Sequence, residues 1–176
     1  MSETRRARIA VLGSINMDLM IRSNKLPLPG ETVIAEAKVE NPGGKGANQA
    51  VAAARMGAEV TMIGCVGDDS FAEELLQNLK TEGVQTQLVS RKRETTSGVA
   101  VVMVETSGEN AILVVPGANG LVGPAELEQA RQVICDSDVL LMQLEVPVET
   151  VIAAAKIARE AGVPGILDPA PAPAHF

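Results

Sequence analysis

The chain has 176 residues, enough for one sizeable core; 46% of them are hydrophobic and 21% are charged. Its formal net charge is −7, with two Phe, no Tyr and no Trp. Nucleic-acid binding needs basic side chains to neutralise phosphates and aromatic rings to stack on bases, so no nucleic-acid partner is expected. No apolar run reaches the roughly 18 residues of a membrane span, and the N-terminus lacks a signal-peptide core.

The two cysteines, Cys65 and Cys135, lie far apart in apolar stretches. A disulfide between them is possible, but two buried thiols are the simpler interpretation. With no predicted membrane span or signal peptide, this favours a cytoplasmic protein. The only histidine, His175, is expected on the surface near the end of the chain, so a histidine-based mechanism is not expected.

The first half of the chain alternates between short apolar runs, which predict strands, and patterns typical of helices. In chain order we expect strands at 9–14, 18–21 and 32–40, a turn at 41–44, a helix at 45–56, a strand at 60–66 and a helix at 70–79. The strand at 32–40 alternates apolar and polar residues and should be half exposed. Ser70 is the expected N-cap of the second helix.

The second half begins with a predicted hairpin and then continues the alternation. We expect strands at 98–104 and 111–115, a helix at 124–134, a strand at 139–144, a helix at 148–161 and a buried strand at 163–167. Apolar strands that alternate with helices predict an α/β fold with a parallel sheet covered on both faces. The strand at 32–40 and the hairpin predict a second, smaller antiparallel sheet.

The Gly-rich stretch at 43–46 enters a predicted helix. Glycines there let a ligand approach free backbone N–H groups, although an ordinary turn before a helix has the same pattern. The stretch is not a Walker A loop, because Gly46 rather than Ser or Thr follows Lys45.

Polar residues follow two of the predicted buried strands: Asn16 and Asp18 follow the first, and Glu145 follows the strand at 139–144. Open α/β sheets bind ligands at the carboxyl ends of their strands, and a carboxylate can accept two hydrogen bonds from a vicinal diol. An Asx turn at Asp18 and a solvated loop carboxylate at Glu145 are equally consistent with the sequence.

Asp68 and Asp69 form a lone carboxylate pair with no third ligand nearby in the sequence. Such a pair is better explained as support for the N-terminus of the helix at 70–79 than as a metal site. We therefore expect no metal site in this chain.

Together, four segments resemble the ribokinase-like (PfkB) carbohydrate kinase family. They are Gly13–Asp18, Pro29–Thr32, Gly43–Ala50 with glycines at 57 and 67, and Val66–Phe71. The resemblance covers essentially the whole chain and corresponds to the N-terminal part of one family domain. It implies a Rossmann-like, doubly wound, mostly parallel sheet with a small β-sheet lid formed by segments 18–42 and 97–116. The lid closes over a sugar and commonly supplies a homodimer interface.

The resemblance also implies which residues bind the sugar. The implied substrate-binding residues are Asn16, Asp18, Gly43, Gly44, Lys45, Asn48, Ala100, Ile112 and Glu145. The polar members would bind hydroxyls, the glycines would bring backbone against the ring, and the lid residues Ala100 and Ile112 would give apolar contact. Several directed polar groups discriminate strongly, because a missing hydroxyl leaves buried groups unpaired.

The family's catalytic base is an Asp in a Gly-Ala-Gly-Asp motif, which does not occur in this sequence. The resemblance therefore implies no catalytic residue here. ATP, Mg²⁺ and a monovalent cation such as K⁺ would be bound mainly by a C-terminal half that this chain lacks. Asp168 also stands where many members have Asn.

The implied activity is the ATP-dependent phosphorylation of D-ribose to ribose 5-phosphate. The alternatives are another sugar or nucleoside kinase of the family, such as a fructokinase-like enzyme, and a non-catalytic sugar-binding or interaction module.

Overall fold

The computed structural model describes residues 5–172, and its centre is a five-stranded parallel sheet in the order β5-β4-β1-β8-β9. The strands are β1 (Arg8–Leu12), β4 (Glu59–Val66), β5 (Gln85–Arg91), β8 (Val139–Met142) and β9 (Gly165–Leu167). The order runs outward from β1 through β4 to β5, then returns to the other side of β1 for β8 and β9. The doubly wound α/β fold is therefore confirmed, with its switch point at β1.

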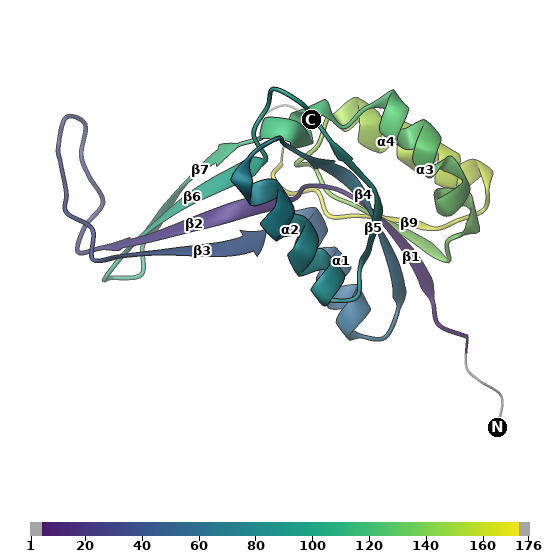
Figure 1. Ribbon diagram of the computed structural model, residues 1–176, viewed down its shortest axis with the longest axis horizontal. Helices are drawn as coiled ribbons and strands as arrows, with labels where there is room; N and C mark the ends of the chain where they lie inside the picture. Colours follow the sequence, from purple (N-terminus) through teal and green to yellow (C-terminus); the bar gives the residue numbers. More distant parts are fainter. Residues whose placement is uncertain (1–4, 173–176) are drawn as a thin grey trace.

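Four helices cover this sheet: α1 (Lys45–Arg55), α2 (Ser70–Thr81), α3 (Pro124–Asp136) and α4 (Val148–Glu160). Helices α1 and α2 lie on one face, and α3 and α4 on the other (Figure 1). Strand β1 is apolar on both sides: Val11 packs in the cluster with α1 and α2, and Leu12 packs in the cluster with α3 and α4. Burial on both faces explains the continuous apolar run at this strand.

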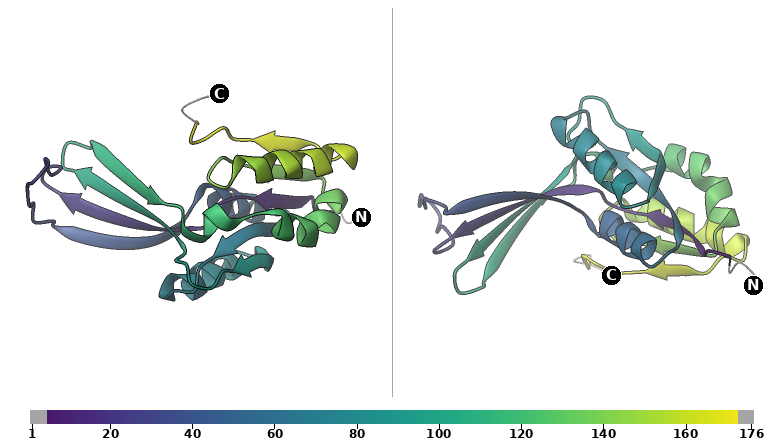
Figure 2. Two further views of the ribbon diagram at one scale, coloured as in Figure 1. Left: turned by 90° about the horizontal axis from the view of Figure 1, so that it is seen from above. Right: turned by 60° about the horizontal axis from the view of Figure 1, so that its bottom comes forward.

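A second, four-stranded sheet projects away from this α/β body (Figures 1 and 2). Its order is β3-β2-β6-β7, and its strands are β2 (Asn16–Ser23), β3 (Ala37–Gly43), β6 (Gly98–Glu105) and β7 (Asn110–Val115). We call it the small sheet. Its two hairpins are antiparallel, but the central strands β2 and β6 run parallel. The prediction of a wholly antiparallel sheet is therefore wrong. One hairpin follows β1 and the other follows β5. Because β1 and β5 run parallel in the body, the first strands of the two hairpins, β2 and β6, also run in the same direction.

Three other expectations need correction. The strand predicted at 32–40 begins only at Ala37, because the pairing of β3 with β2 starts where Ala37 lies opposite Arg22. The N-cap of α2 is Asp69 rather than Ser70, and its side chain accepts from Ala72 N at 3.1 Å. Strand β9 was expected to be buried but is an exposed edge, since no strand is recorded on its outer side among residues 5–172.

Two elements carry no clear periodic signal and were not expected. Strand β5 is largely polar and only partly buried, and η1 (Gly117–Leu121) is a single short 3₁₀ turn after the small sheet.

The thiols of Cys65 and Cys135 are both free, as the simpler interpretation predicted, but only Cys65 is buried, while Cys135 is partly exposed. Burial, and secondarily the charge of Glu126, raises the pKa of Cys65 to about 12. His175 lies outside the described residues. Within those residues, no helix is long and apolar enough to span a membrane.

Candidate functional site

The loops that follow β1 and β8 meet at the carboxyl edge of the body sheet, at its switch point. Ser14, just past β1, is fully buried and donates its hydroxyl to Glu145 Oε2 at 2.5 Å. The same oxygen accepts from Lys45 N at 3.2 Å. Glu145 therefore links the exit of β1, the loop after β8 and the start of α1, where the fold class predicts a ligand site.

The N-terminus of α1 is capped by residues from elsewhere in the chain. Its N-cap is Gly44, which has no side chain to accept a hydrogen bond. Instead, Glu145 accepts from Lys45 N, and Ser14 Oγ accepts from Gly46 N at 3.3 Å. Unpaired amides at a helix start favour negative charge, so Glu145 is held in place by the helix it caps.

Asp18 lies on β2 directly beside this cap. A Cβ placed on Gly43 would overlap the Asp18 carboxylate, so the side chain rests against backbone that only glycine provides. Partial burial, and then the negative charge of Glu145, raises the pKa of Asp18 above its usual value. The site thus holds two neighbouring carboxylates, and both are hydrogen-bond acceptors when ionised.

Asn119, on η1, joins the site although nothing in the sequence indicated it. Its Oδ1 accepts from Ile15 N at 2.9 Å, and its Nδ2 donates to Asn16 Oδ1 at 2.7 Å. A buried asparagine in a single 3₁₀ turn leaves no periodic pattern, so only the fold brings it to the exit of β1.

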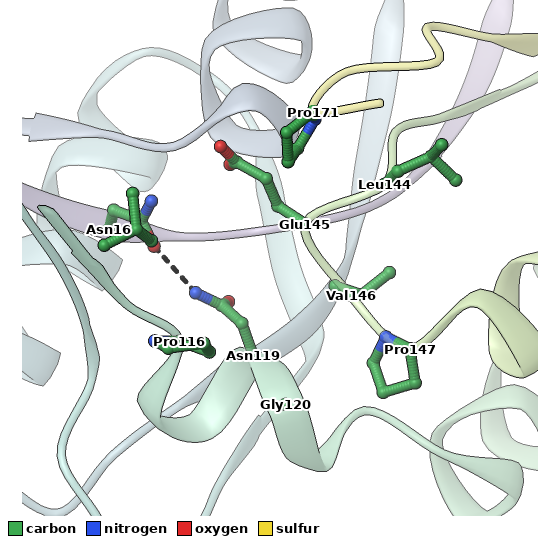
Figure 3. A pocket seen from close by; sticks show the side chains of 10 residues that line it. Asn16, Pro116, Asn119, Gly120, Leu144, Glu145, Val146, Pro147 and Pro171 are labelled. Atoms are coloured by element: carbon green, nitrogen blue, oxygen red, sulfur yellow. Dashed lines mark hydrogen bonds between the residues drawn. The ribbon is translucent and has the colours of Figure 1, made fainter. Parts of the chain in front are cut away.

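A cleft of about 400 Å³ opens between these loops and the small sheet (Figure 3). Its walls are mostly apolar, and its polar side chains are an asparagine pair and one carboxylate, a composition typical of small-molecule sites. The lining residues are Asn16, Val114, Pro116, Asn119, Gly120, Leu144, Glu145, Val146, Pro147 and Pro171.

Of the predicted site residues, Asn16 and Glu145 line the cleft. Asp18, Gly43, Gly44 and Lys45 are not among its lining residues and lie beside Glu145 through the contacts above. Ala100 is buried and lies opposite Asp18 in the pairing of β2 with β6.

Two predicted residues, Asn48 and Ile112, do not line the cleft. Asn48 is exposed on α1, one turn after Gly44, to whose carbonyl oxygen its backbone N–H donates at 2.8 Å. Ile112 is 55% exposed and lies two residues farther out along β7 than Val114, which lines the cleft in its place.

The carboxylate pair considered as a metal site is structural at Asp69. Besides capping α2, this side chain accepts from Ser97 N at 2.8 Å and from Ser97 Oγ at 2.7 Å. It therefore joins α2 to the start of the small sheet's second hairpin, which confirms the helix-support interpretation for Asp69, while Asp68 is exposed. Within residues 5–172, no group of three or more His, Cys, Asp or Glu side chains could hold a metal ion.

Residues 6–175 match the family model described as pfkB family carbohydrate kinase. The chain belongs to this family. It is 46% identical over 164 residues to a ribokinase of Bacillus subtilis (strain 168), covering 93% of this chain and 56% of that protein. It is also 41% identical over 164 residues to a deoxyribokinase of Salmonella typhi, covering 93% of this chain and 54% of that protein.

A solved ribokinase of Arabidopsis thaliana, complexed with ribose and ATP, superposes with a TM-score of 0.85 at 32% identity. The match covers 93% of this chain and 54% of that structure. The chain therefore spans about half the length of the relatives it matches. The family resemblance and the fold class expected from sequence are both confirmed.

Proposed function

We propose that the complete protein transfers a phosphoryl group from ATP to D-ribose and that this chain supplies the sugar side of its site. The observation that carries the proposal is that Asp18 and the glycine-rich start of α1 lie beside Glu145, which lines the cleft. Carboxylate acceptors beside backbone amides suit a small ring with several hydroxyls. Relatives with 46% and 45% identity are named ribokinases, and one solved relative holds ribose and ATP.

Each group would bind a different part of the sugar. Asp18 and Glu145 accept hydrogen bonds from hydroxyls, and Asn16 donates one. Gly43 and Gly44 let the ring approach backbone. Lys45, Asn48, Ala100 and Ile112 complete the proposed contacts.

We further propose that residues 1–176 form the N-terminal part of one ribokinase-like domain. The catalytic base, ATP, Mg²⁺ and a monovalent cation such as K⁺ would then lie in the remainder of the protein. Residues 5–172, which the structure describes, do not fit those groups. The described residues hold no metal cluster, and the first amides of α1 are already bonded to Glu145 and Ser14. Phosphoryl transfer depends on positioning and charge stabilisation around the γ-phosphate, so the chain alone should be inactive.

The small sheet, including segments 18–42 and 97–116, would act as a lid and as a homodimer interface. Its support is a row of apolar side chains across all four strands on one face, Val39, Met20, Val102 and Ile112. Val39, Met20 and Ile112 are 51%, 44% and 55% exposed, an unusual density of apolar surface for a sheet facing water. The double variant Met20→Ser/Val39→Ser should raise the dimer dissociation constant at least tenfold by sedimentation, whereas Ile34→Ser, in the loop before β3, should not.

An ATP-consumption assay on the complete protein tests the function. It offers D-ribose, 2-deoxy-D-ribose, D-fructose and adenosine under equal conditions. The proposal expects the highest kcat/KM with ribose and no detectable turnover by residues 1–176 alone. A clear preference for fructose or adenosine would assign the protein to another branch of the family. Turnover by the isolated chain would overturn the proposal that the catalytic base and the ATP site lie in the remainder of the protein.

The cytoplasmic location expected from sequence is a further proposal, which fractionation of the source cells tests.

A further inference from the structure

The Asn119 side chain is fully occupied by the exit of β1. It is 1% exposed. Its Oδ1 accepts from Ile15 N at 2.9 Å, and its Nδ2 donates to Ile15 O at 3.2 Å and to Asn16 Oδ1 at 2.7 Å. An asparagine side-chain amide has two N–H donors, and both are used here. Asn119 therefore binds both the N–H and the C=O of Ile15, as a residue on a neighbouring strand would, and its second N–H binds Asn16.

The asparagine pair is packed closely against backbone. A Cβ placed on Gly98, the first residue of β6, would overlap both Asn16 Oδ1 and Asn119 Nδ2. In the register of the small sheet, Asn16 pairs with Gly98 on one side and with Gly43 on the other. The two amides are thus packed against backbone at the base of the small sheet, where both hairpins leave the body.

This contact decides which end of the Asn16 amide faces the cleft. Its Oδ1 is directed at Asn119, so the Nδ2 is left for a ligand in the cleft that Asn16 lines (Figure 3). The neighbouring groups, Asp18 and Glu145, are acceptors when ionised. One amide donor therefore stands beside two carboxylate acceptors.

We propose that Asn119 is a positioning residue that makes Asn16 a hydrogen-bond donor toward the substrate and so sets which sugar hydroxyl pattern is accepted. This inference rests on the proposed function, since it concerns how the same cleft discriminates between sugars. Asn119 does not touch the sugar itself. It acts through the Asn16 amide, whose two ends are nearly equal in size but opposite in hydrogen-bonding character.

The variant Asn119→Asp tests the proposal with almost no change in shape. The introduced carboxylate cannot donate, so the oxygen that replaces Nδ2 would face both Ile15 O and Asn16 Oδ1. If the Asn16 amide exchanges the positions of its Oδ1 and Nδ2, the clash with Asn16 Oδ1 is removed. The Oδ1, an acceptor, then faces the cleft.

The assay measures kcat/KM of the complete protein for ribose and for each monodeoxy analogue of ribose. The wild-type protein should discriminate against the analogue that lacks the hydroxyl bound by Asn16 by about tenfold or more, because its absence leaves a buried donor unpaired. In Asn119→Asp the ratio of kcat/KM for ribose to kcat/KM for that analogue should fall to about one. A residue with only a structural role would lower all the values together and leave the ratios unchanged, which would overturn the proposal.

The variant Asn16→Asp is the matched control, because it places an acceptor in the cleft without touching the Ile15 contacts. It should reproduce the altered ratio, and an unaltered ratio there would also contradict the proposal. If Asn119→Asp does not fold, Asn119→Ala removes the donor without adding a charge. It should lower the same ratio, since the Asn16 amide is then free to present either end.

A second readout does not depend on the sugar. In the complete protein with ¹⁵N-labelled asparagine, the Asn119 side-chain amide protons should exchange slowly and those of Asn16 rapidly. In Asn119→Asp the Asn16 amide protons should become protected, because they now face the introduced carboxylate. If no tested sugar is phosphorylated but this protection appears, the proposed function fails and the positioning stands. If Asn16 exchange does not change, the positioning itself is wrong.

Discussion

The α/β body and the small sheet place apolar side chains in opposite environments. In the body, Leu12 and Ile63 are fully buried between the sheet and its helices. In the small sheet, Met20, Val39 and Ile112 are about half exposed, at 44%, 51% and 55%. The body therefore carries the stability of the fold, while the small sheet offers surface for contact. The polar groups of the site lie where the two regions join.

This division predicts three classes of variant. Changes at the junction should alter substrate handling more than stability. Changes in the body should alter stability, and changes at exposed positions of the small sheet should leave the free energy of unfolding nearly unchanged.

Asp18→Asn should give the largest effect, at the junction. Removing one partner of a buried, charge-assisted contact costs about 4 kcal/mol, or about 10³-fold in kcat/KM for ribose in the complete protein. The exposed Asp68→Asn is the matched control and should change kcat/KM less than twofold. Retention of kcat/KM by Asp18→Asn within threefold would remove Asp18 from the site.

The same variant should stabilise the fold at neutral pH. The pKa of Asp18 is raised in the folded state, so the folded state prefers the protonated form and this group destabilises it once ionised. The advantage of Asp18→Asn should therefore be largest above the raised pKa and should vanish below the ordinary value of 3.8. Thermal melts at a series of pH values measure it, and a lower melting temperature at pH 7 would contradict the assigned burial and repulsion.

Leu140→Ala should give the next largest effect, in the body. Leu140 is fully buried on β8, and loss of its side chain should lower the free energy of unfolding by about 2–5 kcal/mol. Ile34→Ala, at a position that is 86% exposed between β2 and β3, should change it by less than about 0.5 kcal/mol. Urea unfolding of both variants makes the comparison, and equal losses would mean that the loop is packed in solution.

Gly43→Ala should damage the junction through crowding alone. Its Cβ would overlap the Asp18 carboxylate and displace it, and a misplacement of about 1 Å costs about 10²-fold in activity. Gly123→Ala is the control, because a Cβ there meets no atom closer than 3.9 Å. If Gly43→Ala keeps its KM for ribose, Asp18 does not need to lie against that glycine.

Ser14→Ala should give the smallest effect. It removes one of the two hydrogen bonds to Glu145 Oε2 and leaves the Gly46 N–H without its partner, a loss of about 1–2 kcal/mol that should appear as a roughly tenfold rise in KM. Ser137→Ala is the control, because that hydroxyl bonds only to Val133 O at the end of α3. An unchanged KM in Ser14→Ala would show that the helix amides alone orient Glu145.

Local patterns predicted much of this architecture. The apolar runs at β1, β4 and β8 and the helical repeats at α1 to α4 are visible because burial on a face imposes a period on the chain. The glycine-rich entry to α1 and the polar residues after β1 and β8 marked the right edge of the sheet, because parallel strands end there together.

The helix start at Asp69, the late start of β3 and the exposure of β9 were predicted wrongly. Each depends on a partner distant in sequence: Asp69 also holds Ser97, β3 extends only as far as β2 pairs with it, and β9 has only one neighbouring strand.

The sequence by itself determined the family, the alternation of strands and helices, and the residue types that suit a hydroxyl-rich ligand. Only the tertiary structure decided that the two halves of the small sheet meet in parallel and that Glu145 caps α1 from another strand. It also decided that Asn119 directs the Asn16 amide. These features join residues roughly eighty to one hundred positions apart, and a one-dimensional pattern carries no information about which distant hydrogen-bond partner each buried polar group finds.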